Sequence, residues 1–275
     1  MNKDRWISST IMISLTIGAV LNQWIFLIVL LTLTIAGLYE FFYLIKKKGI
    51  PIYSYTGIAI GTIIPLLAFF QIEPTRKWDV FFIVIALLTI FILQLSRNDN
   101  HNAIVGISTT LFGVLYVSWF FSFLVKIRYL MPEVPLAGVK LLGFLLLVTK
   151  CGDMGALLIG KKFGKKLLVP KISPNKTVEG ALGSTLFSVL AAVLGSSLIP
   201  QELNFSILHI AAMGAVFGGL GQLGDMSESM LKRDCGVKDS GKMLPALGGA
   251  LDAIDSLLFS APVFYFYLIA LNVVH

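Results

Sequence analysis

The sequence predicts an all-α polytopic integral membrane protein with about nine transmembrane helices and a cytoplasmic N-terminus. Hydrophobic residues make up 56% of the 275 residues, and charged residues only 13%. The mean hydropathy is +0.86, far above the range of soluble proteins. The apolar residues form continuous runs, several of which reach the roughly 20 residues that cross a bilayer as a helix. Strands of a membrane barrel would alternate apolar and polar residues instead.

Nine apolar runs define the expected helices. Only Asn22-Gln23 separates the first two runs, so one long helix broken at that point is the alternative. We expect the first run to be retained as a helix, because no convincing small-residue cleavage site follows it. The runs are residues 6–21, 24–45, 55–71, 78–95, 103–125, 135–149, 181–199, 206–220 and 256–274.

The basic residues predict the orientation. With nine spans and a cytoplasmic N-terminus, Lys140 and Lys150 lie inside spans and most other basic residues lie on the cytoplasmic side. This asymmetry is the positive-inside pattern of a multi-pass protein of the cell (inner or plasma) membrane. The net charge of +7 therefore reflects topology, and we expect no nucleic-acid partner. Cys151 and Cys235 lie on or near the cytoplasmic side, where no disulfide is expected. The outside segments hold only Arg76, Lys77, Lys126 and Arg128.

We predict a single integral membrane domain over residues 1–275. Residues 1–130 are expected to be mainly scaffold helices, in which Glu40 and Asp79 are interpreted as interfacial charges at span ends. Residues 150–260 are expected to be the catalytic region, with its active site on the cytoplasmic side. Its charges gather in three segments, 149–180, 221–242 and 244–256.

Carboxylates at membrane depth indicate a functional site. Each costs several kcal/mol unless it is paired, hydrated or bound to a metal. Asp225 and Glu228 share one helix face, and Asp252 and Asp255 share a face of the next helix. Two such faces would present oxygen ligands of the kind that Mg²⁺ prefers. The alternative is a set of intramembrane ion pairs. The carboxylates in or against apolar spans are Asp153, Asp225, Glu228, Asp252 and Asp255.

Cations, hydroxyls and amides are mixed in the same region, a combination typical of phosphate binding. In "ISPNKTVEG" (172–180), a polar turn precedes an expected helix that Thr177 would cap. The stretch "GKKFGKKLLVPK" (160–171) could instead be a basic patch on anionic lipid. Carboxylates for Mg²⁺ beside cations for phosphate favour phosphoryl or nucleotidyl transfer. The sequence has no Walker P-loop, no GxGxxG motif and no apparent Ser-His-Asp set.

The stretch "SMLKRDCGVKDSGKMLPALGGALDAIDS" (229–256) resembles the signature of the phosphatidate cytidylyltransferases, also called CDP-diacylglycerol synthases. The family pattern runs Ser, Lys-Arg, Lys-Asp, Pro-x-His-Gly-Gly and Asp-Arg-x-Asp, with short gaps between its parts. The upstream "GDMGALLIGKKFGKK" and "ISPNKTVEG" resemble a second conserved block, so the resemblance covers residues 150–260. The matching positions are Ser229, Lys232, Arg233, Lys238, Asp239, Pro245, Gly248, Gly249, Asp252 and Asp255.

Two positions depart from this pattern. Leu247 stands where the family usually has His, and Ala253 where it usually has Arg. We nevertheless expect an active enzyme, because attack by a phosphate needs positioning and charge neutralisation rather than proton abstraction.

The resemblance implies that the protein converts CTP and phosphatidate to CDP-diacylglycerol and diphosphate, in phospholipid biosynthesis. The implied partners are CTP, phosphatidate and the lipid bilayer, with a homodimer as a further possibility. The implied Mg²⁺ ligands are Asp225, Asp252 and Asp255. The implied catalytic residues are Lys232, Arg233, Lys238 and Asp239. The implied substrate-binding residues are Ser173, Asn175, Lys176, Thr177, Glu179 and Ser229.

Three alternatives stay open at this point. A membrane polyprenol or phytol kinase would transfer only the γ-phosphate, and a cytidylyltransferase for another lipid phosphate would differ only in its acceptor. An ion-coupled transporter also uses intramembrane carboxylates. The gathering of charge at one membrane face argues against a transporter.

Overall fold

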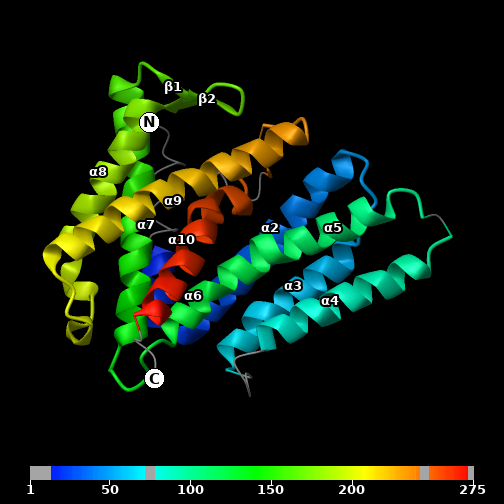
Figure 1. Ribbon diagram of the computed structural model, residues 1–275, viewed down its shortest axis with the longest axis horizontal. Helices are drawn as coiled ribbons and strands as arrows, with labels where there is room; N and C mark the ends of the chain where they lie inside the picture. The colour runs from blue at the N-terminus through cyan, green and yellow to red at the C-terminus, as the bar shows by residue number, and fades with distance from the viewer. Residues whose placement is uncertain (1–13, 72–77, 99, 239, 242–247, 272–275) are drawn as a thin grey trace. The chain divides into compact units, whose positions relative to one another are not determined.

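The computed structural model describes residues 14–71, 78–98, 100–238, 240–241 and 248–271, and its fold is almost entirely helical (Figure 1). Within these residues, five helical segments are long and apolar enough to cross a membrane: α2, the continuous segment from α5 to α6, α7, α9 and α10. Three shorter apolar helices accompany them. The predicted all-α membrane class is confirmed, whereas the number nine and the cytoplasmic N-terminus stay predictions. The helices are α2 (Gln23–Lys47), α3 (Ser54–Phe69), α4 (Trp78–Leu95), α5 (Ala103–Gly113), a π-helical segment (Val114–Trp119), α6 (Phe120–Arg128), α7 (Ala137–Phe163), α8 (Val178–Leu194), α9 (Ile207–Asp234) and α10 (Ala250–Ala270).

A polar residue starts α2 at the predicted break. Asn22 has extended backbone angles, and its Oδ1 accepts the N–H groups of Trp24 at 2.9 Å and Ile25 at 3.2 Å. An asparagine at this position satisfies amides that have no partner within the helix, and so ends one helix and begins the next. Residues 14–21 are helical before it, and the rest of the first predicted run lies outside the described residues.

The chain divides into two compact units, of which the first comprises residues 1–125 and 234–253. In this unit α2 packs against α3, and glycines allow the close approach. A Cβ at Gly57 would lie 2.5 Å from the Phe42 ring, and one at Gly61 would lie 2.6 Å from Leu38. Both large side chains are buried. Small residues at helix interfaces are typical of membrane bundles, where backbones must approach closely to gain packing.

The second unit comprises residues 126–233 and 254–275. Its α7 and α8 pack extensively against each other, and α9 crosses α8 at Gly214 and Gly218. A Cβ at Gly214 would lie 2.8 Å from the backbone of Ser188, so this crossing requires a glycine.

Between α7 and α8 the chain forms a small antiparallel hairpin of β1 (Leu167–Val169) and β2 (Ser173–Thr177) (Figure 1). Leu167 pairs with Thr177, and Val169 with Ser173. The sequence analysis anticipated a turn here but no strands.

Cys235, which directly follows α9, tests the predicted orientation. Both Cys151 and Cys235 are free thiols. Burial, and then the negative charge of Asp234, raise the pKa of the Cys235 thiol. Because the thiolate is the reactive form, labelling should be slower than that of an ordinary cysteine at neutral pH and should accelerate as the pH rises. In a Cys151→Ser variant, a membrane-impermeant maleimide should label inverted vesicles and not intact cells. Labelling of Cys235 in intact cells would place this end of α9 outside.

Candidate active site

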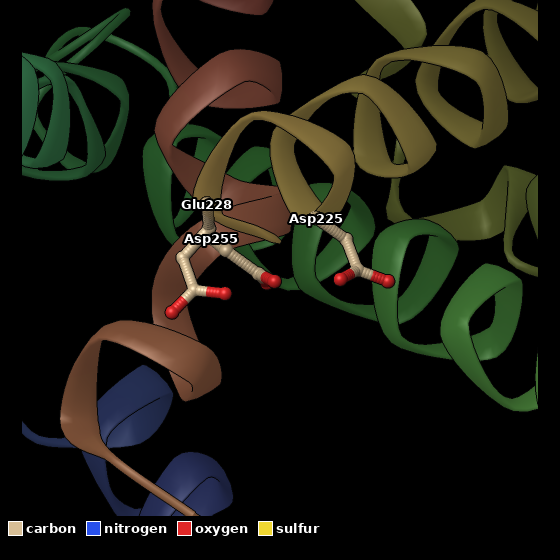
Figure 2. A group of neighbouring side chains, drawn as sticks. All are labelled: Asp225, Glu228 and Asp255. Carbon is tan, nitrogen blue, oxygen red and sulfur yellow. The ribbon is translucent and has the colours of Figure 1, made fainter. Parts of the chain in front are cut away.

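Three carboxylates converge at the contact between α9 and α10. Asp225 and Glu228 come from α9 and Asp255 from α10, as Figure 2 shows. One oxygen of each lies within 4.8 Å of the others. Glu228 is fully buried and Asp255 is 6% exposed, whereas Asp225 is half-buried. Such a group of negative charges is unfavourable at membrane depth without compensating cations.

Gly224 allows α9 and α10 to meet at this point. A Cβ at this position would collide with the carbonyl oxygen of Asp255. One turn earlier, a Cβ at Gly221 would make ordinary contact with the Ser256 side chain, at 3.5 Å. The glycine therefore sets the distance between the helix that carries Asp225 and the helix that carries Asp255.

Two lysines compensate the acidic cluster. Lys232 forms an ion pair with Glu228, one turn earlier on α9. Lys176 reaches from β2, and its Nζ lies 2.6 Å from Oδ1 of Asp225. The hairpin between α7 and α8 thus brings a predicted substrate-binding residue to a predicted metal ligand. The three carboxylates outnumber these two ammonium groups, which leaves carboxylate oxygens available to a cation.

A second polar group connects α7 with α10. Lys150 Nζ donates to Asp153 Oδ2 at 2.9 Å and to Ser256 Oγ at 3.0 Å. The Ser256 hydroxyl lies 3.1 Å from the same Asp153 oxygen. Neither Lys150 nor Ser256 was among the predicted site residues. A lysine within an apolar span is itself a signal of function, and it could have drawn attention to Lys150.

Two predicted substrate-binding residues organise the start of α8. Thr177 caps the helix, as predicted, with its Oγ1 accepting the N–H of Gly180 at 3.1 Å. The carboxylate of Glu179 accepts the N–H groups of Lys165 at 3.0 Å and Lys166 at 3.2 Å. These backbone hydrogen bonds, that from Lys165 first, lower the pKa of Glu179. Glu179 therefore fastens the hairpin to α8, and its contact with substrate stays a prediction.

The other predicted site residues of the second unit lie on β2 and on the last turns of α9. Arg233 Nε donates to the carbonyl oxygen of Ile172 at 3.1 Å, which ties the end of α9 to the hairpin. Ser229 is buried on α9, whereas on β2 Ser173 is half-buried and Asn175 is exposed.

The other predicted residues belong to the first unit. Lys238 is exposed, and Asp239 lies outside the described residues. Asp252 lies in the first turn of α10, where its Oδ2 accepts the N–H of Gly249 at 2.8 Å and the hydroxyl of Ser240 at 2.7 Å. An acidic side chain that reaches back to the residue preceding its helix is half of a capping box. The role of Asp252 as a metal ligand stays a prediction, while Glu228 joins Asp225 and Asp255 in the observed cluster.

Residues 3–271 match the profile of a family described as the cytidylyltransferase family. The chain belongs to this family. A phosphatidate cytidylyltransferase of Synechocystis sp. is 32% identical over 98% of both chains. A phosphatidate cytidylyltransferase of Bacillus subtilis is 33% identical over 84% of this chain and 85% of its own length. An uncharacterized protein of Escherichia coli, YnbB, is 38% identical over 58% of this chain and 50% of its own length. The predicted family is thereby confirmed, and the similarity of this cytidylyltransferase to its relatives extends well beyond residues 150–260.

Proposed function

We propose that this cytidylyltransferase converts CTP and phosphatidate to CDP-diacylglycerol and diphosphate, in phospholipid biosynthesis. The observation that carries the proposal is the convergence of Asp225, Glu228 and Asp255 within 4.8 Å, with Lys176 and Lys232 paired to them. In nucleotidyl transfer, carboxylates bind the metal ion and lysines neutralise charge on the phosphates. The names of the Synechocystis and Bacillus relatives supply the acceptor lipid.

The chemistry needs charge compensation more than a base. A phosphate oxygen of phosphatidate attacks the α-phosphorus of CTP, a new P–O–P link forms, and the bond to the β-phosphate breaks to release diphosphate. A phosphate monoester has a second pKa of about 6, so the nucleophile is already largely ionised near pH 7. The remaining difficulty is the approach of two anions. Lys176 and Lys232 offset this repulsion, and the other predicted cations, Arg233 and Lys238, act on the departing diphosphate.

The acidic cluster fits Mg²⁺. Asp225, Glu228 and Asp255 present hard oxygen atoms close together, as a divalent magnesium site requires. A bound Mg²⁺ would supply a Lewis acid that neutralises charge on the nucleotide phosphates. The residues themselves orient these oxygens, because Glu228 is held by Lys232 and Asp225 by Lys176. Asp252 remains a proposed further ligand.

The site serves a water-soluble nucleotide and a membrane lipid together. We place it on the cytoplasmic side, where CTP is available, while the acyl chains of phosphatidate stay among the lipids around the helices. A homodimer remains part of the proposal.

Purified protein incubated with phosphatidate, Mg²⁺ and CTP labelled at the α- or γ-phosphate tests this function. We expect lipid labelled from α-labelled CTP only, since the CMP group is transferred and the γ-phosphate leaves in diphosphate. Labelling from γ-labelled CTP would identify a lipid kinase instead. Reactions without phosphatidate, or with diacylglycerol in its place, are the controls. No labelled lipid from the natural sequence would contradict the proposed function, unless the Leu247→His, Ala253→Arg double variant formed it readily, which would show that Leu247 and Ala253 are incompatible with activity.

A further inference from the structure

Glu40 on α2 is buried, which corrects the prediction of an interfacial charge. It lies seven residues before Lys47, about 10 Å from the end of the helix. Only 4% of it is exposed, and Ser240 and Leu251 of the first unit lie against its carboxylate. Burying a carboxylate away from water is unfavourable in free energy, so such a group is expected only where hydrogen bonds or charges offset this penalty.

The contacts of Glu40 lie at the start of α10. Its Oε2 accepts the backbone N–H of Leu251 at 3.0 Å and lies 3.3 Å from the Ser240 hydroxyl. The same hydroxyl donates to Asp252 Oδ2 at 2.7 Å, and that oxygen also accepts the N–H of Gly249 at 2.8 Å. The two carboxylates thus satisfy two of the amides that a helix leaves without partners at its beginning. Negative charge is also favourable at this end of a helix.

Two glycines leave room for the Glu40 carboxylate. A Cβ at Gly241 would lie 2.7 Å from Glu40 Cδ, and one at Gly249 would lie 2.8 Å from the same atom. Gly248 has a φ of +98°, a backbone conformation that other residues rarely adopt. The Gly-Gly pair that resembles the family signature therefore has two separate tasks. Gly248 permits the turn, and Gly249 lets the backbone approach Glu40.

We propose that Glu40 is a positioning residue for nucleotidyl transfer, which fixes the first turn of α10 through Leu251 and Ser240. The inference rests on the proposed function. Asp252 lies within that first turn, and Asp255 follows one turn later on the same helix. A first turn that frays or changes its direction would move both carboxylates. Glu40 acts through its hydrogen bonds to the start of α10, so we expect its effect on the rate at saturating CTP rather than on CTP binding.

Three replacements separate the hydrogen bonds of Glu40 from its charge. Glu40→Gln keeps an oxygen that can accept from Leu251, and its amide nitrogen replaces Oε1, an atom without a hydrogen bond to any described residue. Glu40→Asp keeps the charge but withdraws the carboxylate by one methylene. Glu40→Ala removes both. If Glu40 acts through its hydrogen bonds to α10 rather than through its charge, the Gln variant should retain kcat within about threefold. In the Asp and Ala variants kcat should fall at least about tenfold, while KM for CTP stays nearly unchanged. Glu133→Ala, a change at an exposed glutamate of the second unit, is the control and should change neither constant.

Hydrogen exchange in detergent provides a second readout that needs no substrate. The Leu251 amide should exchange at least about tenfold faster in the Ala and Asp variants and near the natural rate in the Gln variant. An unchanged Leu251 amide in all three variants would refute the positioning role, as would full activity of Glu40→Asp beside an inactive Glu40→Gln. If the natural protein makes no CDP-diacylglycerol, the proposed function fails, and the exchange data still decide whether Glu40 fixes α10. Should Glu40→Ala fail to fold, the Gln and Asp variants make the same comparison.

Discussion

Replacing Asp255 with asparagine should abolish most turnover while the protein still folds in the membrane. Asparagine has nearly the same shape as aspartate, but it removes one of the three charges that converge with Asp225 and Glu228. We expect kcat to fall at least about 100-fold, equivalent to about 2.7 kcal/mol of transition-state stabilisation. Thermal stability should stay the same or rise, because a buried carboxylate beside like charges is unfavourable.

Initial rates across a Mg²⁺ titration, together with melting temperatures in detergent, measure both effects. Asp234→Asn is the matched control, since Asp234 is an exposed aspartate of the first unit that pairs with Lys48 of the same unit. This control should keep natural activity. Retention of more than about a third of the activity by Asp255→Asn would show that the cluster does not take part in the reaction.

The apolar runs predicted where the helices lie, but two of the predicted runs end well before the observed helices do. The run 135–149 corresponds to α7, which continues to Phe163, and the run 206–220 corresponds to α9, which continues to Asp234. In both cases the helix goes on after its residues become polar, because backbone hydrogen bonding does not depend on side-chain polarity. The i, i+3 and i+4 spacing of Asp225, Glu228 and Lys232 indicated this continuation, since it places all three on one helical face.

The helix faces of the candidate site could be predicted, but the contacts between helices could not. Spacing placed Asp252 and Asp255 on one face of α10, yet it could not show that Asp252 caps the helix while Asp255 meets α9. That difference depends on Ser240 and on the close approach at Gly224, which have no local sequence pattern. Glu40 is some 200 residues from its partners in the sequence. Its burial therefore leaves no pattern in the residues around it and could not be predicted from them.

Gly224→Ala should separate α9 from α10 and inactivate the enzyme. The added methyl group would collide with the backbone carbonyl of Asp255, an atom that can move only with its helix. Overpacking of this kind costs about 1–3 kcal/mol. We therefore expect a lower melting temperature and, because Asp255 would move away from Asp225 and Glu228, at least about a 50-fold loss of kcat.

Gly219→Ala on the same helix is the matched control for this prediction. Apart from its own stretch of α9, no described residue would come within 4 Å of a Cβ at Gly219, so the change adds a methyl group without a steric clash there. Alanine favours a helix over glycine by about 1 kcal/mol, so this variant should be fully active and as stable as the natural protein or slightly more so. The pair compares one methyl group at two positions five residues apart, and only their neighbours differ. Equal activity and stability of the two alanine variants would mean that α9 and α10 do not meet at Gly224, and the acidic cluster would lose its structural basis.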